Sequence, residues 1–287
     1  MSIFTTASTD YLEWEVPTRE VPIRQGDLLV KHDGVAPRHN EACIVITADC
    51  DIARDKHQGA IAALRIISFA DFVRHRWART AYDSVLDRDF PELTNTFNQQ
   101  RTQGESPEPE ISQEALATWL ERETPDQICQ SIADIKCRDK AKIAAKKVSV
   151  LLGLDDQLTT NEPFDRVLEY MSIKDGIAHT DARIKLLKKA RESLSTLPAD
   201  IFFLNQFPIE KSSSHLILLR ELIPIDPEIA TASPNSARSK KGYLRLGRLK
   251  PAYKYALSQQ FGLMFSRVGL PENYEVSKRK FLKEFEV

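Results

Sequence analysis

The chain has 287 residues, of which 42% are hydrophobic and 28% are charged, with 40 Lys and Arg against 41 Asp and Glu. The composition is that of a globular protein with one large domain or two smaller ones, and a formal net charge of -1 excludes a global attraction to nucleic acid or acidic membranes. No signal peptide is recognisable at the N-terminus, and no apolar run approaches the roughly 18 residues of a membrane-spanning helix. We therefore expect a cytoplasmic protein with reduced cysteines and no membrane partner.

The first eighty residues have the pattern of strands. Gln25-Gly26-Asp27 is a turn signal before the apolar residues 28–30. A short polar loop is expected at 31–40, and a β-branched run follows at 42–47. Residues 60–67 form a third apolar run. The apolar residues at 69, 72, 73 and 77 then have the spacing of a helix.

The middle of the chain has the pattern of helices, after a polar segment. Residues 87–110 are rich in Asn, Gln, Thr, Glu and Pro and predict a flexible loop. Ser112 is a helix cap, Thr124 and Gln127 form a capping box, and Gly153 is a helix stop. Apolar periodicity predicts five helices, at about 112–120, 125–135, 139–152, 164–171 and 184–197.

Strand patterns return near the C-terminus. Residues 201–204 and 215–223 predict a hairpin with a polar turn at 211–214, and 243–246 predict one more strand before a helix at 251–268. We expect an α+β fold: a small SH3-like β-barrel or sheet built from N- and C-terminal strands, with a helical insertion and a C-terminal helix. The expected parts are a β-rich part at 1–86, a flexible loop at 87–110, a helical bundle at 111–198 and the completing strands and helix at 199–287.

The candidate for chemistry is Asp49-Cys50-Asp51, at the end of a predicted strand. The two carboxylates are candidate ligands of a divalent cation, Asp51 could orient a general base, and Cys50 is a nucleophile only if a histidine lies close in space. The alternative is structural: the carboxylates accept hydrogen bonds from backbone N–H groups in a turn. No Glu-x-Lys tripeptide, the usual companion of such carboxylates in metal nucleases, lies in a predicted strand. No other cofactor is expected, because nucleotide-binding glycine motifs are missing.

A second candidate is the basic window 229–271, which has eight Lys and Arg, no Asp or Glu, and three interleaved tyrosines. Cations that neutralise phosphates, with aromatic rings that stack on bases, are typical of nucleic-acid-binding surfaces. The alternative is that residues 233–241 form a flexible solvated loop and that Arg245 and Arg248 make ion pairs with the acidic remainder of the chain. The residues predicted to bind nucleic acid are Arg238, Lys240, Lys241, Arg245, Arg248, Lys250 and Lys254.

Residues 25–30 (QGDLLV), 43–52 (CIVITADCDI) and 265–271 (FSRVGLP) resemble a group of poorly characterised bacterial proteins associated with phage defence. The opening strand–loop–strand is similar to the start of the SH3-like barrel of the PemK/MazF toxins, which cleave RNA. The resemblance implies a barrel. The toxins have an Arg-Pro pair where this chain has Glu41-Ala42, and an aromatic residue where it has Leu28. Because of these two differences, the resemblance implies the barrel of the toxins more strongly than their ribonuclease activity.

The sequence thus predicts a defence or toxin-related component that binds nucleic acid, or a protein encoded nearby, through its basic C-terminal segment. One alternative is a metal-dependent or PemK-like nuclease that uses Asp49 and Asp51. Another is a structural adaptor that docks on a larger ATPase or effector.

Overall fold

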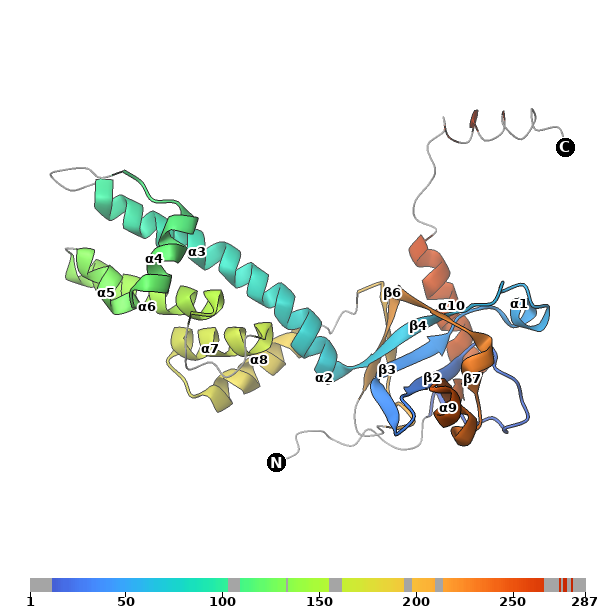
Figure 1. The fold of residues 1–287 in the computed structure, drawn as a ribbon. Helices are drawn as coiled ribbons and strands as arrows, with labels where there is room; N and C mark the ends of the chain where they lie inside the picture. The colour runs from blue at the N-terminus through green and yellow to red at the C-terminus, as the bar shows by residue number, and fades with distance from the viewer. Residues whose placement is uncertain are drawn as a thin grey trace. The chain divides into compact units, whose positions relative to one another are not determined.

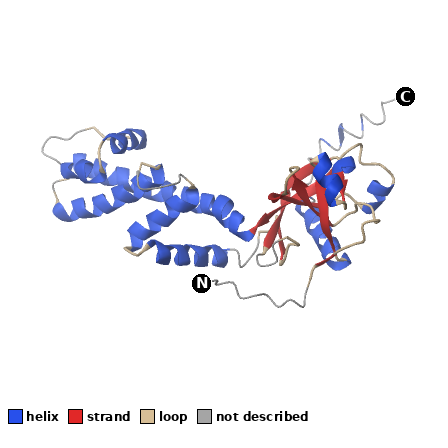
Figure 2. Ribbon diagram, turned by 60° about the horizontal axis from the view of Figure 1, so that its bottom comes forward, coloured by secondary structure: helices blue, strands red, loops and turns tan. Residues whose placement is uncertain are grey.

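The computed structural model describes residues 12–102, 109–132, 134–154, 162–193, 198–209 and 214–265, with Tyr274, Val276, Ser277 and Lys280 beyond them. The protein has an α+β fold in which N- and C-terminal strands form a curled antiparallel half-barrel sheet, with a helical insertion and a C-terminal helix (Figure 1). The chain divides into a β unit (residues 1–69 and 197–287) and a helical unit (residues 70–196). The strands of the described chain are all in the β unit (Figure 2).

The sheet joins strands from the two ends of the chain. Its strand order is β1-β8-β2-β3-β4-β6-β5, so β8 lies between two N-terminal strands, and β7 pairs with β8 outside this path. All neighbouring strands are antiparallel except β7 and β8, which are parallel. The strands are β1 (Trp14–Glu15), β2 (Asp27–His32), β3 (Pro37–Val45), β4 (Ile61–Ser68), β5 (Ile201–Leu204), β6 (His215–Ile225), β7 (Ala230–Thr231) and β8 (Tyr243–Leu249).

The β unit has an apolar core on each face of the sheet. Consecutive side chains of β2 point to opposite faces of the sheet. Leu28 therefore belongs to one apolar cluster and Leu29 to the other, and both are fully buried. Helix α10 (Pro251–Phe265) buries Leu257 in the first cluster. Two short helices complete the unit, α1 (Asp49–Ala53) after β3 and α9 (Pro234–Lys240) before β8, with a 3-10 turn η3 (Pro227–Ile229).

The helical unit has its own core, in which Leu93 and Phe97 of α3 pack with residues of α4, α5 and α6. The predicted caps are confirmed. The Ser112 and Thr124 side chains accept from backbone N–H groups, and Gly153 ends α6 in the left-handed conformation at φ 77°. The helical segments are α2 (Phe69–Phe72), η1 (Val73–Trp77), α3 (Ala78–Thr102), α4 (Gln113–Arg122), α5 (Pro125–Ile128), η2 (Cys129–Ser131), α6 (Ile135–Leu152), α7 (Pro163–Asp175) and α8 (His179–Ser193).

Three local predictions are wrong. The segment 87–110 was expected to be a loop, but its residues up to Thr102 are helical. Helix α3 continues through them despite Pro91, and Leu93 and Phe97 are buried on its inner face. Burial of this sparse apolar stripe outweighs the polar composition. β3 begins at Pro37, inside the expected 31–40 loop, and the expected solvated loop at 233–241 contains α9.

The expected turn at 211–214 and the end of the 251–268 helix lie largely outside the described residues. Among the helices that the structure describes, none is both long enough and apolar enough to span a bilayer.

Candidate functional site

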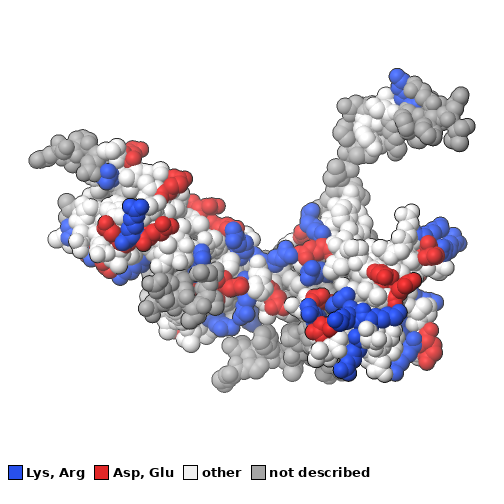
Figure 3. Space-filling view, viewed as in Figure 1, with Lys and Arg blue, Asp and Glu red and all other residues white. Residues whose placement is uncertain are grey.

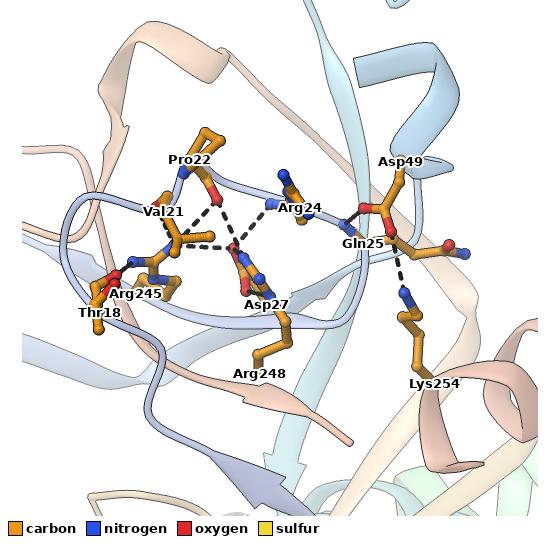
Figure 4. A network of polar contacts seen from close by, with 10 residues as sticks. All are labelled: Thr18, Val21, Pro22, Arg24, Gln25, Asp27, Asp49, Arg245, Arg248 and Lys254. Atoms are coloured by element: carbon orange, nitrogen blue, oxygen red, sulfur yellow. Dashed lines mark hydrogen bonds and ion pairs between the residues drawn. The ribbon is translucent and has the colours of Figure 1, made fainter. Parts of the chain in front are cut away.

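Asp49 lies where β3 passes into α1 and is held by two other parts of the β unit. Its Oδ1 accepts a hydrogen bond of 2.8 Å from the backbone N–H of Gln25, and its Oδ2 accepts one of 3.0 Å from Nζ of Lys254 (Figure 4). The fold therefore brings one predicted acidic residue together with one predicted basic residue, 205 positions apart in the chain. The Gln25 side chain also donates to Ser258 of α10, at 2.9 Å.

These contacts set the ionisation of Asp49. Burial by itself would raise the pKa of this carboxyl, but the hydrogen bonds from Lys254 and from the Gln25 N–H outweigh it and hold the pKa below its ordinary value. Asp49 is therefore a carboxylate that is already engaged by a lysine and a backbone amide. The carboxylate thus satisfies a backbone N–H group, as the structural alternative expects, but the group belongs to Gln25 before β2 and not to the turn after β3.

Cys50 and Asp51 have fewer contacts. Cys50 is exposed, and its thiol donates to Oδ1 of Asp51 at 3.7 Å. His57, in the loop after α1, pairs through Nε2 with Asp55 at 3.0 Å, while its Nδ1 is buried without a hydrogen-bond partner. Within the described parts of the chain, no three His, Cys, Asp or Glu side chains cluster in a way that could hold a metal ion.

Among the described residues of the β unit, the shortest ion pair involves Asp27, a residue that the sequence did not indicate as a site. Asp27 is fully buried at the start of β2. Its two carboxylate oxygens accept from Nε and Nη2 of Arg248, at 2.6 and 3.0 Å, and Arg245 lies 3.6 Å away. The backbone N–H of Arg24 donates at 2.9 Å. Burial nevertheless raises the pKa of Asp27, against the opposing effect of Arg248.

Arg245 is an interior residue. Its side chain is 2% exposed, and its guanidinium donates to the backbone carbonyls of Val21 at 2.7 Å, Pro22 at 3.1 Å and Thr18 at 2.7 Å (Figure 4). Arg248 also donates to the Pro22 carbonyl, at 3.1 Å. The two arginines fasten the segment between β1 and β2 to β8. Arg245 and Arg248 are therefore engaged with Asp27 inside the β unit, and Lys254 is engaged with Asp49. Nucleic-acid binding by these three residues stays a prediction.

Three exposed residues of the basic window lie together, on α9 and directly after it. We call Arg238, Lys240 and Lys241 the cationic corner; all three are exposed. Arg238 donates to the carbonyl of Gly34 at 3.0 Å, and Lys240 to the carbonyl of Glu228 at 2.7 Å. Lys241 ends α9 in the left-handed conformation at φ 48°.

The partners of the cationic corner differ from those of other surface arginines. A backbone carbonyl fixes a cation without cancelling its charge, whereas a carboxylate cancels it. Lys and Arg lie mixed with Asp and Glu on the face in Figure 3. Elsewhere in the β unit, Arg38 pairs with Asp33 and Glu41, Arg65 with Glu221, and Arg220 with Asp200.

The remaining residues of the basic window do not extend the corner. Lys250 is exposed just before α10, and residue 267 lies outside the described residues. Of the tyrosines, Tyr243 is half-buried with Nζ of Lys31 4.7 Å from its ring centre, Tyr253 is half-buried against the core, and Tyr255 is exposed on α10. The predicted combination of cations and stacking rings is therefore not present at the corner.

The groove of about 280 Å³ in the β unit lies elsewhere, lined by Ala199, Asp200, Arg220, Gln260, Leu263 and Met264. It includes none of the predicted site residues.

Comparison with known proteins adds no assignment, since the chain matches no protein-family model, no curated protein sequence and no solved structure.

Proposed function

We propose that the β unit binds the sugar-phosphate backbone of nucleic acid through the cationic corner. The observation that carries the proposal is the partnering of Arg238 and Lys240, which are held by neutral carbonyls rather than by carboxylates. With Lys241 they present three positive charges within four residues of the chain. Such a surface neutralises phosphates and releases their counterions.

The expected binding is weak and independent of sequence. Since none of the three described tyrosines of the basic window is an exposed ring at the corner, contacts to phosphates rather than base stacking supply the free energy. Three neutralised phosphates on a single strand predict a slope of about -2 for log K against log salt concentration. The dissociation constant is expected to fall in the range of roughly 10⁻⁶ to 10⁻⁴ M that is typical of such contacts.

The test compares two variants with the same change of charge. Lys240→Glu/Lys241→Glu reverses two charges of the corner and leaves Arg238 on the Gly34 carbonyl. Arg54→Glu/Lys56→Glu reverses two exposed charges in the loop after α1. Fluorescence anisotropy with labelled single-stranded RNA, single-stranded DNA and duplex DNA, at a series of salt concentrations, measures affinity and salt slope.

We expect the corner variant to lose about tenfold in affinity or more and to show a shallower salt slope, while the loop variant keeps most of both. Equal losses in the two variants would mean that only the net charge matters. Parental protein without measurable binding at low salt would rule out the proposed function.

The resemblance to phage-defence proteins and to the PemK/MazF barrel supports a finer version of this proposal. In it, the half-barrel is a relative of the SH3-like toxins that contacts nucleic acid without cutting it. We do not extend the proposal to cleavage at Asp49, Cys50 and Asp51, because the Asp49 carboxylate is already bound by Lys254 and Gln25. The adaptor alternative stays a prediction from the sequence.

A further inference from the structure

The hairpin between β2 and β3 ends in a turn that is fixed by hydrogen bonds. Oδ1 of Asp33 accepts from the backbone N–H groups of Val35 at 2.8 Å and Ala36 at 2.9 Å. The N–H of Asp33 donates to the Ala36 carbonyl at 3.3 Å, and the N–H of Gly34 donates to Nδ1 of His32 at 3.1 Å. All four backbone N–H groups from Asp33 to Ala36 therefore have acceptors, which restricts the conformations of the turn.

This turn holds an apolar side chain out in solvent. Val35 is 84% exposed, the largest exposed fraction among the large hydrophobic residues that the structure describes. A single exposed apolar residue is common on protein surfaces. Here, however, the backbone that carries it is already ordered, so a ligand that covers Val35 costs little additional conformational entropy.

The turn lies against the cationic corner. Nε of Arg238 donates to the carbonyl of Gly34 at 3.0 Å, and a Cβ added at Gly34 would lie 3.5 Å from Cε of Lys241. Gly34 thus contacts two of the three cations of the corner, and Val35 is the next residue of the chain. The exposed apolar side chain and the cations therefore belong to one continuous surface.

The hairpin also carries charges of its own. Hydrogen bonds from the N–H groups of Ala36 and Val35 lower the pKa of the Asp33 carboxyl to about 2, so Asp33 is negative at neutral pH. Arg38 pairs with Asp33 at 3.3 Å and with Glu41 at 2.9 Å. These three residues sum to one negative charge, against the three positive charges of the cationic corner. The combined surface is therefore positive and attracts phosphates.

We infer that the hairpin turn extends the cationic corner into a site for unpaired nucleotides. In this site the cations hold phosphates, and Val35 covers the face of a base. The inference rests on the proposed function and names its substrate class. Phosphate contacts supply most of the affinity, as proposed above, and the turn adds a preference for single strands.

The preference follows from where apolar surface is available on nucleic acid. An unpaired base exposes its apolar face, whereas neighbouring bases cover both faces inside a stacked duplex. To reach a face in a duplex, the side chain would have to open a base step, and this costs more free energy than the burial of one valine returns. Val35 therefore contributes to single-strand binding and not to duplex binding.

The test compares two matched substitutions, Val35→Thr and Val16→Thr. Both replace an exposed valine of the β unit by a polar residue of similar shape and change no charge; Val16 is 73% exposed. Fluorescence anisotropy measures binding to single-stranded RNA, single-stranded DNA and duplex DNA of equal length. Val35→Thr is expected to lower the affinity for both single strands about threefold, because less apolar surface is buried, and to leave duplex affinity and the salt slopes unchanged. Val16→Thr should behave as the parent.

The outcomes separate this inference from the proposed function. Parental protein that binds no nucleic acid contradicts both. Binding that is lost in Lys240→Glu/Lys241→Glu but unchanged in Val35→Thr, or weakened equally for single strands and duplex, leaves the cationic corner standing and overturns the role of the turn.

A direct measurement follows the valine methyl groups by NMR. During titration with single-stranded RNA, the methyl resonances of Val35 should shift, because a base that covers them adds its ring current, whereas those of Val16 should not. Titration with duplex DNA should leave both in place. Val35 methyl resonances that stay unshifted at saturation with single-stranded RNA would show that the turn does not contact a base.

Discussion

At the scale of single residues, the basic window contains two kinds of cation that look alike in the sequence. Arg245 and Arg248 lie inside the β unit with Asp27, whereas the cationic corner is exposed on α9. Arg248 lies in β8, and the strand register places it directly opposite Asp27. This pairing gives two residues that were predicted to bind nucleic acid a structural contact inside the β unit. A buried carboxylate with no partner would be strongly destabilising, so Arg248 is the residue on which the pair depends.

Replacement of Arg248 tests this directly. Arg248→Met removes both side-chain hydrogen bonds to Asp27 and is expected to lower the free energy of unfolding at neutral pH by about 3 kcal/mol. Arg38→Met, which removes an exposed arginine, is the matched control and should change the free energy of unfolding far less, because solvent screens its ion pairs. Urea unfolding measures both. Equal stabilities of the two variants would contradict the structural role of Arg248.

The pH dependence of the same variant has a definite sign. Burial already raises the pKa of Asp27 above the unfolded value of 3.8, and loss of Arg248 should raise it further. The folded state then holds this proton more tightly than the unfolded state, so stability falls as the pH rises from 3.8 through the raised pKa. Arg248→Met should therefore regain stability on acidification. The double variant Asp27→Asn/Arg248→Met should lose that part of the dependence.

At the scale of elements, the helical unit contains a polar cluster where α3, α6 and α7 meet. Asp89 is 4% exposed and accepts from Lys147 at 2.8 Å, from Arg88 at 2.7 Å and from the Tyr170 hydroxyl at 2.9 Å. Burial and the neighbouring Asp89 carboxylate raise the pKa of Tyr170 to about 12. Two residues of α3 and one each of α6 and α7 thus form a cluster that apolar periodicity does not reveal.

Tyr170→Phe should weaken this junction. Loss of one hydrogen bond to a buried carboxylate is expected to cost about 1–2 kcal/mol of unfolding free energy. In the parent, the unfolded chain releases the Tyr170 proton near pH 10, whereas the folded chain holds it to about 12, so stability declines across this window. The variant should lack that decline. Far-UV circular dichroism during urea unfolding measures both effects, and Tyr255→Phe, at an exposed hydroxyl, is the control. A variant with parental alkaline behaviour would contradict the assignment.

At the scale of the molecule, the two units have separate cores. The two apolar clusters of the sheet contain no residue from 70–196, and the cluster around Leu93 and Phe97 contains none from the β unit. The sheet instead depends on both ends of the chain, because β8 pairs with β1 and β2. Sequence distance is therefore a poor guide to which parts stabilise each other.

Deletion of the insertion tests this organisation. Replacement of residues 70–196 by a short Gly-Ser linker should leave a β unit that melts cooperatively, since its apolar core is retained. Truncation after residue 240, which removes β8 and α10, should abolish cooperative melting. Circular dichroism during heating distinguishes the two. A deletion variant that does not melt cooperatively would show that the sheet needs the helical unit.

The sequence by itself determined the features that depend on neighbours in the chain. Local hydrogen bonding and apolar spacing account for the helix caps at Ser112 and Thr124, the helix end at Gly153 and the turn at Gly26 before β2. They also account for the strand and helix patterns at both ends of the chain. The loop that the polar composition predicted at 87–102 is wrong, because burial of a few residues of α3 makes this segment helical.

Only the tertiary structure decided which charges meet. Asp27 and Arg248 are 221 residues apart, and Asp49 and Lys254 are 205 apart, so no local pattern could pair them. The strand order also decided which cations are exposed. Arg245 is buried because β8 lies between two N-terminal strands, whereas the cationic corner on α9 is in solvent. The physical reason is that the strength of a charge at a surface depends on burial and on the partner, and both are set by strand order rather than by sequence.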